Sequence, residues 1–310
     1  MHVGVPLLAL AVALLIDRCW GEPPAWAHPV VAMGRYLGAL GPRLTTWRPT
    51  WAFIGGALAW WLGAALVVAL AAFVQSLASQ WPWPVQGLFL GVLLKPLLAW
   101  RMLRDEVAHV EQALGQSVEA GREQLQRLVS RDVSELDDFA VRESAIESLA
   151  ENLNDSLVAP LFWFAVGGLG GAALYRFANT ADAMWGYRGR YEWVGKWAAH
   201  ADDVLSWLPA RVTALLLCLA AGRWPGWSAI RRQARVTPSP NGGWPMGVMA
   251  LLLEVRLSKP GVYVLNDAGQ PPQAKHTAQA LAWAQTAVWW AAALSAVLML
   301  GTLYCARGTP

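Results

Sequence analysis

The sequence predicts an all-α integral membrane protein, a helical bundle with about four to six membrane segments and amphipathic helices on the cytoplasmic side. Composition is the first observation behind this prediction: 56% of the 310 residues are hydrophobic and 15% are charged. A soluble domain of this size carries about a quarter charged residues. Clustering is the second, because the apolar residues form long runs. We therefore expect residues 1–310 to form a single membrane-embedded domain.

Six apolar segments are the expected membrane segments, near 3–16, 50–74, 82–100, 157–175, 204–221 and 280–304. A helix needs about 20 residues to cross the hydrocarbon layer, so the second and the last segment qualify most clearly. The fourth is short and contains Pro160 and a GGLGG cluster, which suggests a re-entrant segment. The polar elements between the segments are 17–49, 101–156, 176–203 and 222–279.

Loop charge predicts the orientation. Segment 17–49 contains four arginines, whereas the link 75–84 has neither lysine nor arginine. The positive-inside rule then places 17–49 and 101–152 in the cytoplasm and 75–84 outside. The polar stretches 176–203 and 222–279 are equally basic, so we expect the fourth and fifth segments to dip in and return, or to lie buried against the bundle. The expected location is a bacterial inner (cytoplasmic) membrane, with a multi-pass chain whose active face is cytoplasmic.

Several residue types argue against other classes of protein. The net charge of +3 and the lack of a basic patch interleaved with aromatics argue against nucleic-acid binding. Three cysteines without CxxC spacing support neither a disulfide framework nor a zinc site. Lys95, near the end of the third segment, is expected to extend to the interface and to have no catalytic role. Tryptophans at segment ends, such as Trp100, are expected to anchor the protein in the headgroup layer.

A row of carboxylates between 134 and 161 is the main candidate for a site. Ser134 and Asp137 have the spacing of a capping box that opens a helix. Within that helix the carboxylates recur every four residues, at Glu143, Glu147, Glu151 and Asp155. Like charges at this spacing cost about 0.2–0.5 kcal/mol per pair, so arginines, a divalent cation or a phosphate-bound metal should lie opposite. The alternative is a solvated acidic face, but the row runs into the apolar LVAPLFWF, which favours a site.

Other polar clusters border the apolar segments. The region 176–211 mixes carboxylates and arginines, which suits a magnesium nucleotide, because carboxylate oxygens bind Mg²⁺ and arginine clamps phosphate. Internal ion pairs are the alternative explanation. His28 precedes a proline and is more typical of a structural hydrogen bond than of catalysis. The turn at Asn241 resembles a backbone anion cradle. The sequence contains no Walker loop, GxGxxG, HExxH or GxSxG motif.

Taken together, the clusters resemble one known family. The stretches that carry the resemblance are GEPPAWAHPVVAMGR, RDVSELD, ESLAENLNDSLVAPLF, YRFANTADAMWGYRGRY, ADDVLSWLPARVTALLL and SPNGGWPMGVMALLLEVRL. They occur in the family's order between residue 17 and about residue 262, and in this combination they are similar to the CobD/CbiB proteins of cobalamin biosynthesis, the adenosylcobinamide-phosphate synthases.

The resemblance implies an ATP-dependent carbon–nitrogen ligase in the membrane. Such an enzyme joins the propionate carboxylate of adenosylcobyric acid to the amine of (R)-1-amino-2-propanol phosphate, or to free aminopropanol. The implied cofactors are ATP and Mg²⁺, and an acyl phosphate is the expected intermediate. The expected partners are this corrinoid, the amino alcohol and membrane lipids, with no nucleic acid; the resemblance leaves an oligomer open.

The resemblance also implies site residues. The residues implied in catalysis are Glu147, Glu151, Asp155, Asp182 and Asp203. Those implied in binding substrate or phosphate are His28, Arg35, Arg131, Asn152, Asn179, Tyr187, Arg190, Arg211 and Asn241. Glu151, Asp155 and Asp182 are the expected Mg²⁺ ligands.

Departures from the family pattern keep a second hypothesis open. Arg188, Ser206 and Met246 stand where the family usually has Lys, Asn and Glu. A non-catalytic signalling or assembly protein of the AmpE type, built on the same scaffold, would tolerate such changes. A transporter fits less well, because transporters place charges at the membrane midplane, whereas here they gather at the membrane edge.

Overall fold

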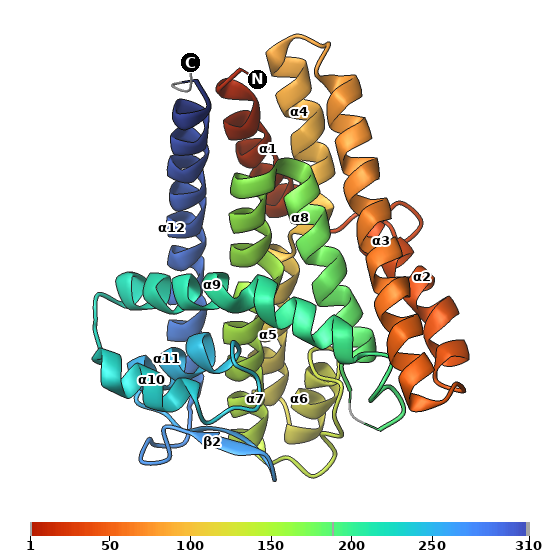
Figure 1. The fold of residues 1–310 in the computed structure, drawn as a ribbon. Helices are drawn as coiled ribbons and strands as arrows, with labels where there is room; N and C mark the ends of the chain where they lie inside the picture. Colours follow the sequence, from red (N-terminus) through yellow and green to blue (C-terminus); the bar gives the residue numbers. More distant parts are fainter. Residues whose placement is uncertain (1, 188, 308–310) are drawn as a thin grey trace. The chain divides into compact units, whose positions relative to one another are not determined.

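The structure, a computed structural model, describes residues 2–187 and 189–307, so that Arg188 lies outside it. The described chain is almost entirely helical, with one short β-hairpin (Figure 1), which confirms the prediction of an all-α membrane bundle. Internal contacts divide the chain into two compact units. Unit 1 comprises Met1–Ala99, Ala159–Ser206 and Ala292–Pro310, and unit 2 comprises Trp100–Val158 and Trp207–Ala291. The prediction of a single domain stays a prediction.

Five helical stretches in the described part of the chain are long and apolar enough to cross a membrane. They are Pro49–Ala78, Trp83–Leu114, Asp138–Trp185, Lys196–Ala221 and Ala274–Thr302. Five of the predicted segments fall within or overlap these stretches. The remaining segment, 3–16, forms helix α1, Gly4–Trp20, whose 17 residues make it shorter than the others.

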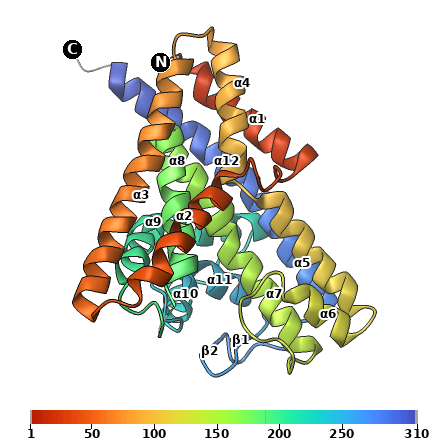
Figure 2. The same ribbon diagram turned by 90° about the vertical axis from the view of Figure 1, so that its right-hand side faces the viewer.

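Unit 1 is built on two helix packings. Helix α1 packs against α4 (Trp83–Leu94), while α2 (Pro29–Leu44) and α3 (Pro49–Ala78) pack against α8 (Ala159–Trp185). Figure 2 shows α3 and α8 side by side. Helix α8 is interrupted at Gly168, whose φ of 61° and ψ of −152° are tolerated because glycine has no Cβ. The GGLGG cluster therefore breaks the helix formed by the predicted fourth segment.

Lys95 corrects one prediction. It begins the short 3₁₀ helix η1 (Lys95–Leu97) after α4 and is only 2% exposed, so its side chain does not reach the interface. Its Nζ donates to Glu22 Oε1 at 2.6 Å and pairs with Asp17 Oδ1 at 3.3 Å. The stem is buried because a charge partner is available inside unit 1, which removes the need to extend to water.

Unit 2 contains helices α5 (Trp100–Leu114), α6 (Val118–Leu125), α7 (Asp138–Leu153), α10 (Trp227–Ala234) and α11 (Gly243–Leu253). Helices α9 (Lys196–Ala221) and α12 (Ala274–Arg307) each contribute to both units. Helices α5 and α6 are amphipathic helices and lie almost entirely within the predicted polar element 101–156. Trp100 is not an interfacial anchor: it is buried, and its Nε1 donates to Gln285 Oε1 at 3.1 Å.

The start of α7 differs from the predicted capping box. Asp137 is the N-cap, and its carboxylate accepts from the Ala140 N–H at 2.8 Å. The Ser134 N–H instead donates to Asp132 Oδ1 at 2.9 Å, in a turn before the helix. Both arrangements satisfy free N–H groups, and the aspartate lies directly beside the first turn.

The hairpin of β1 (Leu257–Lys259) and β2 (Tyr263–Leu265) packs against α7 through β1 (Figure 2). The strands pair Leu257 with Leu265 and Lys259 with Tyr263. Gly261 supplies the positive φ of 72° that the tight connection uses. Leu257 and Leu265 are fully buried, which secures the hairpin on the unit 2 core.

Candidate active site

The carboxylate row on α7 is mostly removed from water. Glu143 is 1% exposed and Glu147 is 5% exposed, whereas Glu151 and Asp155 are partly exposed. The interpretation of the row as a solvated acidic face is therefore wrong for its first two members. Burying an isolated carboxylate is costly unless a partner neutralises it or donates hydrogen bonds, so the partners of these two side chains indicate what each one does.

Glu143 is held by the segment that enters the hairpin. Its Oε1 accepts from Arg256 Nε at 3.2 Å, and its Oε2 accepts from the backbone N–H of Ser258 at 3.0 Å and from the Ser258 hydroxyl. Both carboxylate oxygens are thus satisfied by the protein itself. Glu143 joins the hairpin to α7 and has a structural role.

Glu147 is less completely satisfied. The Tyr263 hydroxyl donates to Oε1, and Arg131 Nη2 lies 3.7 Å from Oε2. Within the described part of the chain, Oε2 is buried and has no hydrogen-bond partner. Burial, followed by the charge of Glu147, raises the pKa of Tyr263, so the phenol stays protonated and remains a donor. One oxygen of Glu147 is therefore left for another donor.

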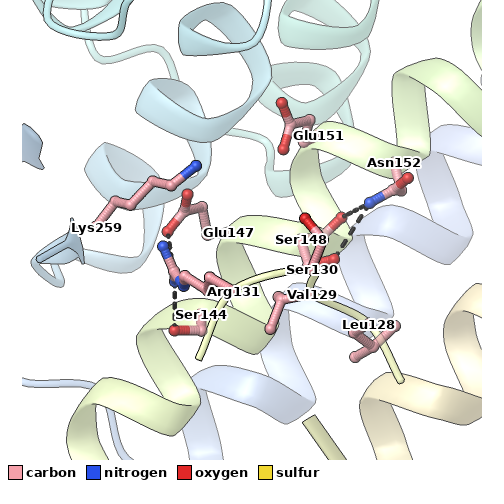
Figure 3. Close-up of a pocket in the computed structure, with 10 residues that line it drawn as sticks. All are labelled: Leu128, Val129, Ser130, Arg131, Ser144, Glu147, Ser148, Glu151, Asn152 and Lys259. Carbon is pink, nitrogen blue, oxygen red and sulfur yellow. Dashed lines mark hydrogen bonds and ion pairs between the residues drawn. The ribbon is translucent and has the colours of Figure 1, made fainter. Parts of the chain in front are cut away.

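Glu147 lines a cavity of about 140 Å³. Figure 3 shows the ten side chains that line it: Leu128, Val129, Ser130, Arg131, Ser144, Glu147, Ser148, Glu151, Asn152 and Lys259. Arg131 also donates to the Ser144 hydroxyl at 2.7 Å, and Asn152 donates to the Ser148 hydroxyl at 3.2 Å. The lining thus has two carboxylates, two cations and several hydroxyls in a small volume.

The row changes direction after Glu151. Residues Asn154–Val158 form a π-helical turn, η2, and the described residues that line the cavity do not include Asp155. Asn154 donates to Asp155 Oδ1 at 2.8 Å and accepts from the Thr213 hydroxyl at 3.1 Å. A π turn winds more residues into each turn than an α turn, so the spacing of four that aligned Glu143, Glu147 and Glu151 does not extend to Asp155.

Comparisons with known proteins identify the family of the chain. The family model described as CobD/Cbib protein matches residues 10–297. The chain belongs to the CobD/CbiB family. It is 40% identical over 309 residues to a probable cobalamin biosynthesis protein CobD of Thermococcus kodakarensis, covering 98% of both chains. It is 37% identical to the cobalamin biosynthesis protein CobD of Chromobacterium violaceum, covering 96% of this chain and 98% of the relative. No solved structure matches the chain.

Several residues that the CobD/CbiB resemblance implied lie in unit 1, whereas the cavity is built by unit 2. They are His28, Arg35, Asn179, Asp182, Tyr187, Arg190 and Asp203. His28 caps α2, with Nδ1 accepting from the Val30 N–H at 3.2 Å and Nε2 lying 3.1 Å from Glu22 Oε2. This is the structural role that the sequence favoured for it. Arg35 and Arg190 are exposed, and Asn179 and Asp182 are partly buried on α8.

Arg211 and Asn241 lie 30 residues apart in this chain and are in contact in unit 2. Arg211 Nη1 donates to Asn241 Oδ1 at 3.0 Å. The Asn241 N–H and the Gly242 N–H both donate to the Ser239 hydroxyl at 3.2 Å. The backbone N–H groups of the turn predicted as an anion cradle are therefore already bonded to Ser239. The charged group beside the turn is Arg211.

Sequence reasoning missed the residues that the hairpin contributes. Ser258, Lys259 and Tyr263 sit in strands of three residues, too short for a periodic pattern to stand out, although the Gly261 turn between alternating residues was a usable signal. Among the described residues there is no group of three or more His, Cys, Asp or Glu side chains placed to hold a metal ion. The Mg²⁺ ligand set of Glu151, Asp155 and Asp182 stays a prediction.

Proposed function

We propose that this CobD/CbiB protein is an ATP-dependent ligase of cobalamin biosynthesis. It forms an amide between the propionate carboxylate of adenosylcobyric acid and the amine of (R)-1-amino-2-propanol phosphate, or of free aminopropanol. The active face is cytoplasmic, on the inner membrane in a bacterial host. Support comes from the family membership and from the contents of the unit 2 cavity.

The observation that carries the proposal is that Glu147 lines the cavity and that its buried Oε2 lacks a hydrogen-bond donor in the described part of the chain. An ammonium group provides such a donor together with a matching charge. Arg131 and Lys259 line the same cavity and suit a phosphate. A small molecule with an amine at one end and a phosphate at the other matches both sets of groups.

Cavity size favours the amino alcohol over the larger substrates. Sites for drug-sized ligands occupy about 300–1,000 Å³, and the cavity measures about 140 Å³. A nucleotide or a corrinoid can place only its reacting group there. The amino-alcohol phosphate is therefore the ligand that we assign to this cavity.

The chemistry assigns separate tasks to the cavity groups. The substrate carboxylate attacks the γ-phosphorus of ATP and displaces ADP, which yields an acyl phosphate. The amine then attacks the acyl carbon and inorganic phosphate leaves, so the ammonium must first lose a proton. Glu147 is placed to accept it, and Arg131 and Lys259 neutralise phosphate.

Glu151 lines this cavity and would hold Mg²⁺ there with Asn152 beside it, while Asp155 and Asp182 are the other ligands that the resemblance implies. Glu151 and Asn152 fit the ion. They offer the carboxylate and amide oxygens that this ion accepts, and one or two carboxylates are enough when phosphate oxygens and water complete the shell. When bound, the ion would reduce the negative charge of the nucleotide phosphates.

Growth that depends on completion of the corrinoid tests the proposal. A host without its own synthase, expressing this chain and supplied with cobyric acid, is expected to grow. Glu151→Gln and Asp182→Asn are each expected to abolish growth without lowering the amount of protein in the membrane, while the exposed controls Glu123→Gln and Asp267→Asn retain it. Failure of the well-expressed wild-type protein to support growth would contradict the ligase.

Tyr263→Phe is expected to lower the free energy of unfolding by about 1–3 kcal/mol, because it removes the hydroxyl donor and leaves Glu147 Oε1 buried without it. Thermal unfolding of the detergent-solubilised protein measures the effect, with Tyr304→Phe as the control because Tyr304 is 82% exposed. Equal midpoints for the two variants would show that the hydroxyl is not needed to satisfy Glu147.

A further inference from the structure

A second and larger cavity in unit 2 does not share any lining residue with the carboxylate cavity. It is a groove of about 740 Å³, within the range of small-molecule sites. Its walls come from α9, α10 and the loop that leads into α11, through Trp207, Arg211, Trp227, Arg231, Arg235 and Trp244, together with small and proline residues of 234–240. The family resemblance implies substrate or phosphate binding for Arg211 alone, and neither it nor the proposed chemistry assigns a ligand to Arg231, Arg235 and the tryptophans of the groove.

The charge of the groove has one sign. Three arginines line it, and the described lining residues include neither aspartate nor glutamate. Arg231 and Arg235 are exposed and lie four residues apart, so they project from the same side of α10 and its end. Like charges at this spacing repel each other, and an anion between them would remove the repulsion.

Arg211 is fixed in position at the wall. Its guanidinium carbon lies 4.3 Å from the centroid of the Trp207 ring and 4.6 Å from that of Trp244, and its Nη1 donates to Asn241. Nη1 also donates to the Trp207 carbonyl, and Nη2 donates to the Pro240 carbonyl at 3.5 Å. The guanidinium is therefore already ordered by the protein, and it contributes a fixed positive charge to the groove. Trp207 and Trp227 remain about half exposed and offer flat apolar surface beside the cations.

We propose that this groove binds the phosphate group of a ligand, through Arg211, Arg231 and Arg235, with an apolar part of the ligand against the tryptophans. The phosphate can belong to a free nucleotide or to the headgroup of an anionic phospholipid, since both present the same oxygens. The resemblance already implies substrate or phosphate binding for Arg211; the proposal goes beyond the ligase in adding Arg231, Arg235 and the tryptophans, none of which line the carboxylate cavity.

Binding to the full-length protein in phosphatidylcholine nanodiscs tests the proposal in two arms. One arm measures ATP binding by equilibrium dialysis without Mg²⁺ or corrinoid. The other measures how much phosphatidylglycerol the protein retains from mixed lipid, by extraction and mass spectrometry. The variant Arg231→Gln/Arg235→Gln is expected to weaken binding in one arm by about tenfold for each charge. Arg232→Gln is the matched control, because Arg232 is exposed on the same helix but does not line the groove.

Loss confined to the ATP arm identifies a free phosphate ligand, and loss confined to the phosphatidylglycerol arm identifies a lipid headgroup. Loss in both arms supports a phosphate site open to either source. The proposal is overturned if the wild-type protein binds neither ligand, or if the double variant and Arg232→Gln bind both as the wild type does. If the double variant unfolds, the single variants Arg231→Gln and Arg235→Gln are measured in its place in both arms. None of these results depends on growth, so they are separate from the test of the ligase.

Discussion

Glu147→Gln is expected to abolish corrinoid-dependent growth while the protein remains in the membrane. The substitution keeps the shape of the side chain and leaves an oxygen that can accept from Tyr263. It removes the negative charge that faces the cavity and the group assigned to take the proton from the amine. Removing a general base typically lowers the rate by about 10²–10⁴-fold. Growth measures the effect, and Glu123→Gln on the exposed surface of α6 is the control.

A loss of growth can also arise from instability, because Arg131, whose Nη2 lies 3.7 Å from Glu147 Oε2, would lose a carboxylate partner. The double variant Glu147→Gln/Arg131→Gln separates the two causes, since it removes both charges together. Recovery of growth in the double variant would show that Glu147 acts by stabilising the fold and would contradict its chemical role. A double variant that is folded in the membrane and still inactive excludes instability as the cause of the loss; because Arg131 is itself assigned to phosphate, this result tests the two groups together.

Lys95→Met is expected to lower the free energy of unfolding by about 3–5 kcal/mol, because breaking a buried ion pair leaves uncompensated charge. In unit 1 the Lys95 ammonium is shared by Asp17 and Glu22, whose side chains are 3% and 19% exposed. Methionine fills a similar volume, so the loss of stability measures the removal of the charge and not a change in packing. Chemical unfolding of the solubilised protein measures it, and the exposed Lys275→Met is the control.

Adding Glu22→Gln to Lys95→Met removes one of the stranded carboxylates and is expected to recover part of the lost stability. Glu22 also lies 3.1 Å from His28 Nε2, so recovery will be incomplete. If Lys95→Met unfolds at the same denaturant concentration as the wild type, the buried ammonium does not neutralise the two carboxylates, and the account of unit 1 fails.

Local pattern was enough to predict the helices and the row of carboxylates. Leu103, Val107 and Val110 recur at helical spacing and are buried on α5, because a helix that packs on one face places its apolar residues along that face. Glu143, Glu147 and Glu151 share a side of α7 for the same geometric reason. The alignment failed at Asp155, since the π turn depends on contacts such as the hydrogen bond from Thr213 to Asn154, which join residues 59 positions apart.

The partners of the charged side chains could not be read from local pattern. Lys95 is paired with a residue 73 positions away, and Glu147 with Tyr263, 116 positions away. A lysine at the end of an apolar segment looks the same in sequence whether it extends to water or turns inward. The outcome depends on whether the fold places a carboxylate within reach, because only a paired charge tolerates burial.

The sequence by itself determined the family, the all-helical membrane class and the spacing of the carboxylates, because composition, hydrophobic periodicity and local motifs are properties of neighbouring residues. Only the tertiary structure decided that Glu143 anchors the hairpin, that Glu147 lines a cavity and keeps one oxygen without a described hydrogen-bond donor, and that three arginines but no described acidic residue line a groove. Those outcomes depend on which distant segments pack together, since burial and pairing, not side-chain identity, set the chemistry that a charge can perform.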